Sequence, residues 1–180
     1  LGIVLFDFDN SADTAVELAD EEKLYFEKFR MKNTVFEITD KDGKFSILKA
    51  DVVEENTPGK KIYDLTNPDA QTLDNGKTIT LTALAGAYNQ NKQELVLTTN
   101  VIANYDKQME IKTNSGTYNF ASERGFGNEK VIGNGEKGNF EADRFTFDKA
   151  KGIMTVIGNV YMKSADTELR SPDKAILFAN

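Results

Sequence analysis

Most of the chain, after the first thirty or so residues, alternates apolar with polar positions in short runs that are separated by turn residues. Phe36 and Ile38 alternate in the first such run. Phe45 and Ile47 alternate in the next, after a turn at 42–43. A period of two places alternate side chains on the same face of a strand, and the β-branched and aromatic residues of these runs favour strands. The pattern therefore predicts an all-β fold.

Glycine-containing turns separate the runs. The pair at 42–43 is Asp-Gly, and the pairs at 75–76 and 134–135 are Asn-Gly, the last of them just before Phe140. Glycine tolerates the positive φ that a tight hairpin turn requires. We therefore predict that strand follows strand through local hairpins.

The N-terminal segment differs from the rest. Residues 11–28 are rich in Asp, Glu and Ala, which fits either a short amphipathic helix or a charged lead-in to the first strand. The apolar run at 1–6 is broken by Asp7 and Asp9, so these residues supply neither a signal-peptide core nor a membrane span. We predict a lead-in at 1–28, following an anchor outside this sequence, and one β domain at 29–180.

An internal repeat indicates an elongated architecture. A shift of 59 positions places Tyr88 on Phe147, Leu95 on Met154 and Leu97 on Val156 without a gap. The same shift superposes the Asn-Val pairs at 100–101 and 159–160, where we predict a bend that the Asn side chain supports. A second echo, at a shift of 58, pairs Ile111 with Leu169, Tyr118 with Ile176 and Phe120 with Phe178. Stacked repeats of this kind predict a core that extends along an axis.

Composition excludes several function classes. The chain has 180 residues with no His, and also no Cys or Trp, which removes the usual general base, thiol nucleophiles and nearly all zinc or copper sites. We expect no enzyme, no cofactor and no metal. The net charge of −7 and a pI near 4.8 would repel a polyanion, so we expect no nucleic-acid partner.

Three further features of the sequence have alternative interpretations. The glycine-rich stretch at 125–138 lacks the Lys-Ser or Lys-Thr of a phosphate-binding loop and instead suggests a close β crossing. The Asp-x-Asp-Gly at 40–43 resembles the start of a calcium loop, but its Gly comes too early, so we predict a hairpin turn. A carbohydrate-binding β-sandwich remains an alternative, with Tyr63, Tyr105 and Tyr161 as its available aromatics.

The repeat residues resemble a known family. The organic-solvent-tolerance-A-like repeat of lipopolysaccharide transport proteins is similar to this chain at Ala83, Gly86, Tyr88, Leu95, Leu97, Asn100, Val101, Gly158, Asn159 and Val160. The segment at 42–51, with Asp42, Gly43, Ala50 and Asp51, resembles the opening of the periplasmic domain of the LptC family. The resemblance covers roughly residues 29–180.

This resemblance implies a twisted β-jellyroll, open at both ends, that holds the acyl chains of lipopolysaccharide in an apolar groove. It implies a periplasmic protein that is tethered to the inner membrane by an N-terminal helix outside this sequence. Its implied partners are lipopolysaccharide, an inner-membrane ABC transporter at the N-terminal edge and a periplasmic jellyroll bridge protein at the C-terminal edge. The net charge of −7 suggests that phosphates are left to solvent and divalent ions while the acyl chains are gripped.

Two sets of residues are candidates for these roles. From periodicity alone, an ordinary sandwich core is the favoured role of the first set, and only the resemblance favours lipid binding. The alternative for the second set is a strand that closes the chain's own sheet. The expected lipid-binding residues are Phe36, Ile38, Ile47, Ile79, Leu81, Leu95, Leu97, Val101, Phe120, Phe147, Met154, Val156 and Val160. The expected partner-binding edge is Lys174, Ala175, Ile176, Leu177 and Phe178, a strand with few charges to blunt it.

Overall fold

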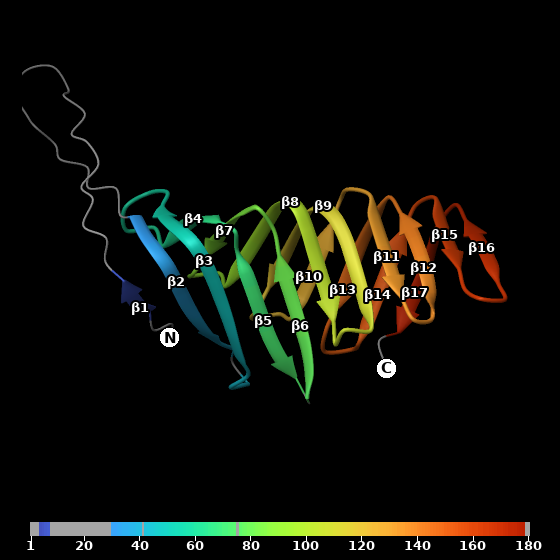
Figure 1. The fold of residues 1–180 in the computed structure, drawn as a ribbon, viewed down its shortest axis with the longest axis horizontal. Helices are drawn as coiled ribbons and strands as arrows, with labels where there is room; N and C mark the ends of the chain where they lie inside the picture. Colours follow the sequence, from blue (N-terminus) through green and yellow to red (C-terminus); the bar gives the residue numbers. More distant parts are fainter. Residues whose placement is uncertain (1–3, 8–29, 41, 75, 179–180) are drawn as a thin grey trace, which may run out of the picture.

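The computed structural model describes residues 4–7, 30–40, 42–74 and 76–178. These residues form 17 strands in one antiparallel sheet that extends along a single axis (Figure 1), which confirms the predicted all-β jellyroll. Within these ranges no helix is long and apolar enough to cross a membrane. The helix considered at 11–28 lies outside the described residues, and the domain division at 28/29 stays a prediction, although β1 pairs with β2.

The strand boundaries are as follows. They are β1 (Val4–Asp7), β2 (Arg30–Thr39), β3 (Phe45–Glu55), β4 (Ile62–Thr66), β5 (Asp69–Asp74), β6 (Lys77–Thr82), β7 (Ala85–Asn89), β8 (Glu94–Tyr105), β9 (Met109–Asn119), β10 (Arg124–Gly127), β11 (Val131–Gly135), β12 (Gly138–Ala142), β13 (Arg144–Asp148), β14 (Ile153–Ile157), β15 (Val160–Lys163), β16 (Glu168–Ser171) and β17 (Lys174–Phe178).

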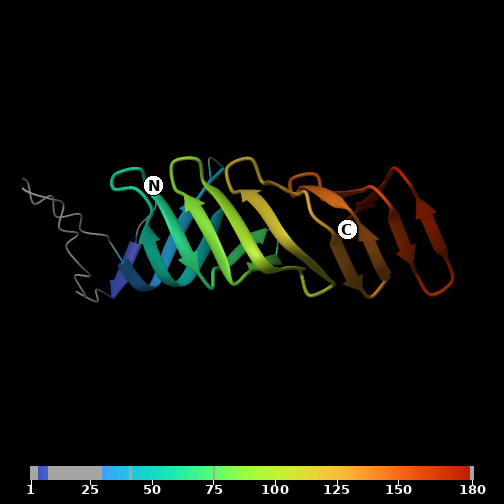
Figure 2. The same cartoon turned by 90° about the horizontal axis from the view of Figure 1, so that it is seen from above.

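The sheet is one meander folded along its length into two layers. Strand β8 shows the fold most clearly, because its first half pairs with β7 and its second half with β6. Likewise β3 pairs with β4 through one half and with β5 through the other. We call β4, β7, β10, β13, β14 and β17 layer A, and β5, β6, β11, β12, β15 and β16 layer B. Strands β3, β8 and β9 run through both layers (Figure 2).

Asparagines in the left-handed conformation make the corner between the layers. Asn100 has φ 53° at a register shift in β8, and Asn159 has φ 45° between β14 and β15. Both bends predicted from the Asn-Val pairs are therefore confirmed. Asn33 and Asn67 adopt the same conformation, with φ 49° and 50°. Asn tolerates this region better than most residues, which explains its use at these four corners.

The 59-residue repeat is also a structural repeat. Tyr88 pairs with Leu95 across β7 and β8, and Phe147 pairs with Met154 across β13 and β14. All four side chains point between the layers and join the hydrophobic core. The repeat found in the sequence therefore marks equivalent hairpins of layer A.

The second echo is correct at Leu169 but wrong at Ile176. Leu95 and Met154 are equivalent in the 59-residue repeat. Buried Tyr118 pairs with Leu95, and Leu177 pairs with Met154, so Leu177 is the equivalent of Tyr118. Ile176 instead lies on the outer face, 51% exposed. A one-residue slip exchanges the two faces of a strand, and the corner before β17 restores the 59-residue shift. The companion pairing with Phe178 was off by one for the same reason.

Two of the predicted turns are confirmed. Asp40 Oδ1 accepts hydrogen bonds from the backbone N–H groups of Asp42 and Lys44, both at 2.9 Å, and Gly43 has φ 78°. The hairpin of β5 and β6 turns through Gly76, with φ 77°. In both turns the glycine supplies the positive φ that was expected.

The third turn lies two residues further on than predicted. Gly135 pairs with Gly138, so the turn is at 136–137 and the Asn-Gly pair belongs to β11. The rings of Phe140 and Phe145 cover Gly133 and Gly127, their cross-strand partners, where a Cβ would overlap the ring. The glycine-rich stretch is therefore a site of close packing, as the sequence suggested.

The core consists of two clusters along the axis. The first contains residues from β2 to the turn that follows β9, among them Phe36, Tyr88 and Phe120. The second contains residues of β11–β15, among them Phe140 and Val156. Phe147 packs against both clusters and so marks the junction between them.

Candidate functional site

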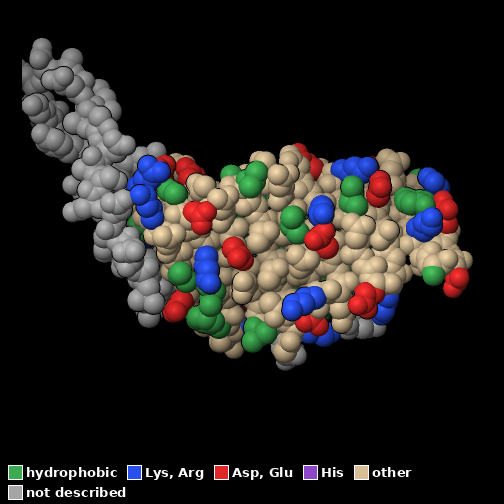
Figure 3. Space-filling view, viewed as in Figure 1, with side chains coloured by type: hydrophobic (Ala, Val, Ile, Leu, Met, Phe, Trp, Pro, Cys, Tyr) green, Lys and Arg blue, Asp and Glu red, His purple; other side chains and the backbone are tan. Residues whose placement is uncertain are grey.

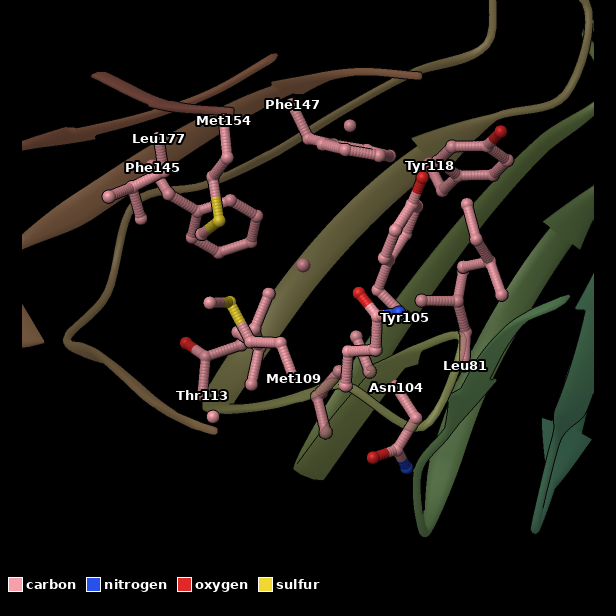
Figure 4. A pocket seen from close by; sticks show the side chains of 18 of the residues that line it. Leu81, Asn104, Tyr105, Met109, Thr113, Tyr118, Phe145, Phe147, Met154 and Leu177 are labelled. Carbon is pink, nitrogen blue, oxygen red and sulfur yellow. The ribbon is translucent and has the colours of Figure 1, made fainter. Parts of the chain in front are cut away.

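A cavity of about 180 Å³ lies between the layers at the junction of the two core clusters. Layer A contributes side chains from β13, β14 and β17, and they face β6, β8 and β9 across the cavity (Figure 4). The residues that line it are Ile79, Leu81, Leu97, Val101, Ala103, Asn104, Tyr105, Gln108, Met109, Ile111, Thr113, Gly116, Thr117, Tyr118, Gly125, Gly135, Glu136, Lys137, Phe145, Phe147, Met154 and Leu177.

Strand alternation and small residues together create this space. Leu97 and Val101 point inward from β8 on either side of its bend, and Met154 faces them from β14. Gly116 leaves room beside them, because the nearest atoms to a Cβ built there are 3.8 Å away. An apolar cavity in an otherwise close-packed interior is a feature that binding sites share.

Part of the predicted lipid-binding set meets at the cavity. Those residues are Ile79, Leu81, Leu97, Val101, Phe147 and Met154. Another part packs as core instead: the ring of Phe36 lies 5.2 Å from that of Tyr88, which lies 6.3 Å from Phe120. Ile38 and Leu95 belong to the same N-terminal cluster. Val156 and Val160 belong to the C-terminal cluster, buried between the layers.

Ile47 lies apart from the rest of that set. It alternates with buried Ser46 and Leu48, so its side chain is on the outer face of β3. The register of the first hairpin decides this, because Phe36 pairs with Leu48 and Ile38 pairs with Ser46. The inward positions that follow the turn are therefore these two residues rather than Phe45 and Ile47.

The structure adds cavity residues that the sequence analysis missed. Tyr105 continues the inward alternation of Val101, and Met109 and Ile111 continue it after the turn. That alternation was available as a signal, but the bend at 99–100 divided it. Phe145 and Leu177 come from strands whose facing positions only the register shows.

The rim of the cavity is polar on its layer B side. Asn104 and Gln108 flank the turn between β8 and β9, and Glu136 and Lys137 form the turn between β11 and β12. An apolar interior with a polar rim suits an amphipathic molecule, whose apolar part is buried while its polar part stays in water.

A polar cluster joins the two layers beside the cavity. Glu123 Oε1 accepts hydrogen bonds from Lys149 Nζ at 3.1 Å and from Lys44 Nζ at 3.2 Å. Lys149 Nζ also lies 3.4 Å from Thr72 Oγ1. The Lys149 side chain is only 3% exposed and that of Glu123 11%. The cluster therefore connects two turns of layer A, which carry Glu123 and Lys149, to β5 and to the turn between β2 and β3.

The C-terminal end of the roll presents strand edges. In the described residues β17 pairs only with β14, and β16 pairs only with β15. Leu169 of β16 is the cross-strand partner of Met162, whose side chain packs against the C-terminal core cluster, yet Leu169 is 47% exposed. The apolar interior thus reaches the surface at this end.

The tyrosines do not form an exposed platform for sugars. Tyr63 packs against the core, with its ring 5.3 Å from that of Phe36, and Tyr105 lines the cavity. Tyr161 lies beneath the Arg170 guanidinium, at 4.5 Å. Burial, followed by the charge of Glu55, raises the pKa of Tyr63, as expected for an enclosed phenol. These positions weaken the carbohydrate-binding alternative.

Charges of both signs are interspersed on the face that Figure 3 shows. Lys130 pairs with Glu141 at 2.9 Å, and Arg124 pairs with Asp148 at 3.4 Å. Such exposed pairs contribute little stability and create no large field of one sign.

Comparison with models of protein families identifies a family. A family model described as lipopolysaccharide-assembly, LptC-related, matches residues 1–164. No curated protein matches the chain.

Proposed function

Since this chain belongs to the LptC-related family of lipopolysaccharide-assembly proteins, we propose that it binds lipopolysaccharide by the acyl chains, in the cavity between layers A and B. The family acts in lipopolysaccharide transport, in association with the periplasm and inner membrane, and is not a family of enzymes. The observation that carries the proposal is the apolar cavity at Phe147, where the two core clusters meet.

Burial of acyl chains would supply the binding energy. Each methylene that leaves water contributes about 0.8 kcal/mol, so even part of one chain would be held firmly against Leu97, Met154 and Phe147. The polar rim, with Lys137 beside Glu136, carries both charges and leaves the phosphates to solvent and divalent ions. This division would let the cargo slide along the interior without breaking strong ionic contacts.

We place the transfer to the next protein at the C-terminal end. The edge of β17, which comprises Lys174, Ala175, Ile176, Leu177 and Phe178, could add a strand of a partner jellyroll. Leu169 on β16 would then continue the apolar interior into that partner. The opposite end, where β1 pairs with β2, would face the inner-membrane ABC transporter that supplies the lipid, with an N-terminal helix as the tether.

Photocrosslinking tests the cavity. A photoreactive amino acid at Phe147 is exposed to purified lipopolysaccharide, with and without excess phospholipid. The matched control carries the same group at Ile47, on the outer face of β3. We expect an adduct at Phe147 that phospholipid does not compete away, and none at Ile47.

Two results would contradict the proposal. A well-folded protein without an adduct at Phe147 or Leu97 would mean that these residues form a closed core. Equal adducts at Phe147 and Ile47 would mean that the lipid adheres to the surface without entering the cavity. In either case binding of a de-acylated glycan would next test the carbohydrate-binding alternative.

A further inference from the structure

The polar cluster of Lys44, Thr72, Glu123 and Lys149 occupies the opening between the layers, opposite the corner. Glu123 belongs to the turn between β9 and β10, and Lys149 to the turn between β13 and β14, both in layer A. Lys44 closes the β2–β3 hairpin and Thr72 lies on β5, where the sheet forms layer B. The cluster therefore fastens the free rims of the two layers to each other.

The same cluster borders the cavity. Lys149 follows Phe147 by two residues and Glu123 precedes Gly125 by two, and both of those neighbours line the cavity. On layer B, Thr72 pairs with Ile79, which lines it as well. Two contacts cross the opening, Lys149 to Thr72 and Lys44 to Glu123. Any widening of the cavity toward this rim must break both of them.

The cluster differs from a surface ion pair a single residue away. Arg124 pairs with Asp148 at 3.4 Å, but both lie on strands of layer A and the Arg124 side chain is 66% exposed. Lys149 is 3% exposed, and a buried charge is tolerated only with close partners. The backbone reinforces the position, since Lys149 N–H donates to the Glu123 carbonyl at 3.0 Å.

The size of the cavity gives this contact a function. About 180 Å³ is little more than an engineered cavity that admits benzene, and less than the usual 300–1,000 Å³ of a drug-sized site. A lipid with several acyl chains does not fit until the layers part, whereas a segment of one chain does.

We propose that Lys44, Glu123 and Lys149 form a latch that determines which lipids enter the roll. With the latch closed, the cavity admits a single acyl chain. A lipid with several chains enters only when Glu123 releases Lys44, Lys149 releases Thr72, and the rims of layers A and B separate. This inference rests on the proposed function and specifies which residues select the cargo.

The test compares two neighbouring substitutions. Glu123→Gln keeps the side-chain shape and removes the charge that both lysines contact, and Arg124→Gln removes the exposed pair in layer A. Association rates are measured with fluorescent lipopolysaccharide and with a fluorescent single-chain fatty acid. For E123Q we expect the lipopolysaccharide rate to rise about tenfold, as a loss of roughly 1.4 kcal/mol of closing free energy would give. The fatty-acid rate, and both rates of R124Q, should stay within about twofold of the original.

Folding is checked by circular dichroism. If E123Q does not fold, Lys44→Gln carries the same test, because that side chain is 35% exposed and its loss disturbs less buried structure. An unchanged ratio of the two rates in the folded variant would overturn the latch and leave the proposed function intact. If the original protein bound neither ligand, the proposed function would fail, and the latch with it.

Discussion

Asn159 Nδ2 donates a hydrogen bond to Asp143 Oδ2 at 2.8 Å, at the corner where β12 meets β13 and β14 meets β15. Asn67 donates to Asp51 in the same way, also at 2.8 Å and also across 16 residues of sequence. These pairs hold the left-handed asparagines of two corners in place. At a third corner, that of Asn100, the residue equivalent to Asp143 is Leu84. The backbone shows the equivalence, because Leu84 N–H donates to the Thr99 carbonyl just as Asp143 N–H donates to the Gly158 carbonyl.

Leu84→Asp should therefore stabilise the protein. The new carboxylate would accept from Asn100 as Asp143 does from Asn159, and an apolar side chain that is 51% exposed would be removed. We expect the free energy of unfolding to rise by about 0.5–1.5 kcal/mol in denaturant titrations. Leu84→Ala is the control, because it removes the leucine without adding an acceptor. Equal stability of the two variants would show that the corner pair contributes nothing.

Gly133→Ala should destabilise the C-terminal half. A Cβ at this position overlaps the Phe140 ring, which is buried in the core and only 2% exposed. Overpacking of this kind costs about 1–3 kcal/mol. Gly116→Ala is the matched control, since its Cβ meets ordinary contacts at 3.8 Å in the cavity wall. Thermal unfolding distinguishes them, and a G133A midpoint equal to that of G116A would contradict the packing seen here.

Stability should fall at alkaline pH through Tyr88. Burial, together with the smaller effect of Tyr63, raises the pKa of Tyr88 from 10.0 to about 12. Below pH 10 both the folded and the unfolded state keep the proton, so this contribution is fully present. Between about pH 10 and pH 12 the unfolded state ionises first, and the folded state loses roughly 2–3 kcal/mol.

Unfolding free energies measured from pH 8 upward should show this decline, and Tyr88→Phe should remove most of it. Tyr63→Phe should remove a smaller part of the decline, because the Tyr63 side chain is less buried than that of Tyr88. A Y88F profile that matched the original would mean that other groups cause the alkaline loss.

Ile176→Lys should weaken binding to a jellyroll partner. Ile176 is 51% exposed on the outer face of the edge strand β17, and a lysine there blunts an edge against strand addition. Thr155→Lys places the same charge on the adjacent, fully paired strand, because Thr155 is the cross-strand partner of Ile176. We expect affinity for the partner, by titration calorimetry, to fall about tenfold for I176K and little for T155K. A larger loss of affinity for T155K than for I176K would show that the partner binds away from this edge.

Local patterns in the sequence predicted a large part of this architecture. Alternation predicted the strands, Asp42-Gly43 predicted the first hairpin, and the Asn-Val pairs predicted the bends at Asn100 and Asn159. Each of these features depends on the conformational preferences of a few consecutive residues, which can be predicted from the residue types alone. The repeat of Tyr88 in Phe147 was visible for the same reason, since equivalent hairpins need equivalent inward residues.

Only the tertiary structure decided which side of each strand faces inward and what lies across from it. Ile47 and Ile176 are as apolar as their neighbours, but the register places both on the outer face. A one-residue change in a turn or corner exchanges the faces, and no local preference records it. The cavity at Phe147 and the contact of Glu123 with Lys44 depend on how layer A lies over layer B. Segments far apart in the chain meet there, because the whole meander folds along its corner.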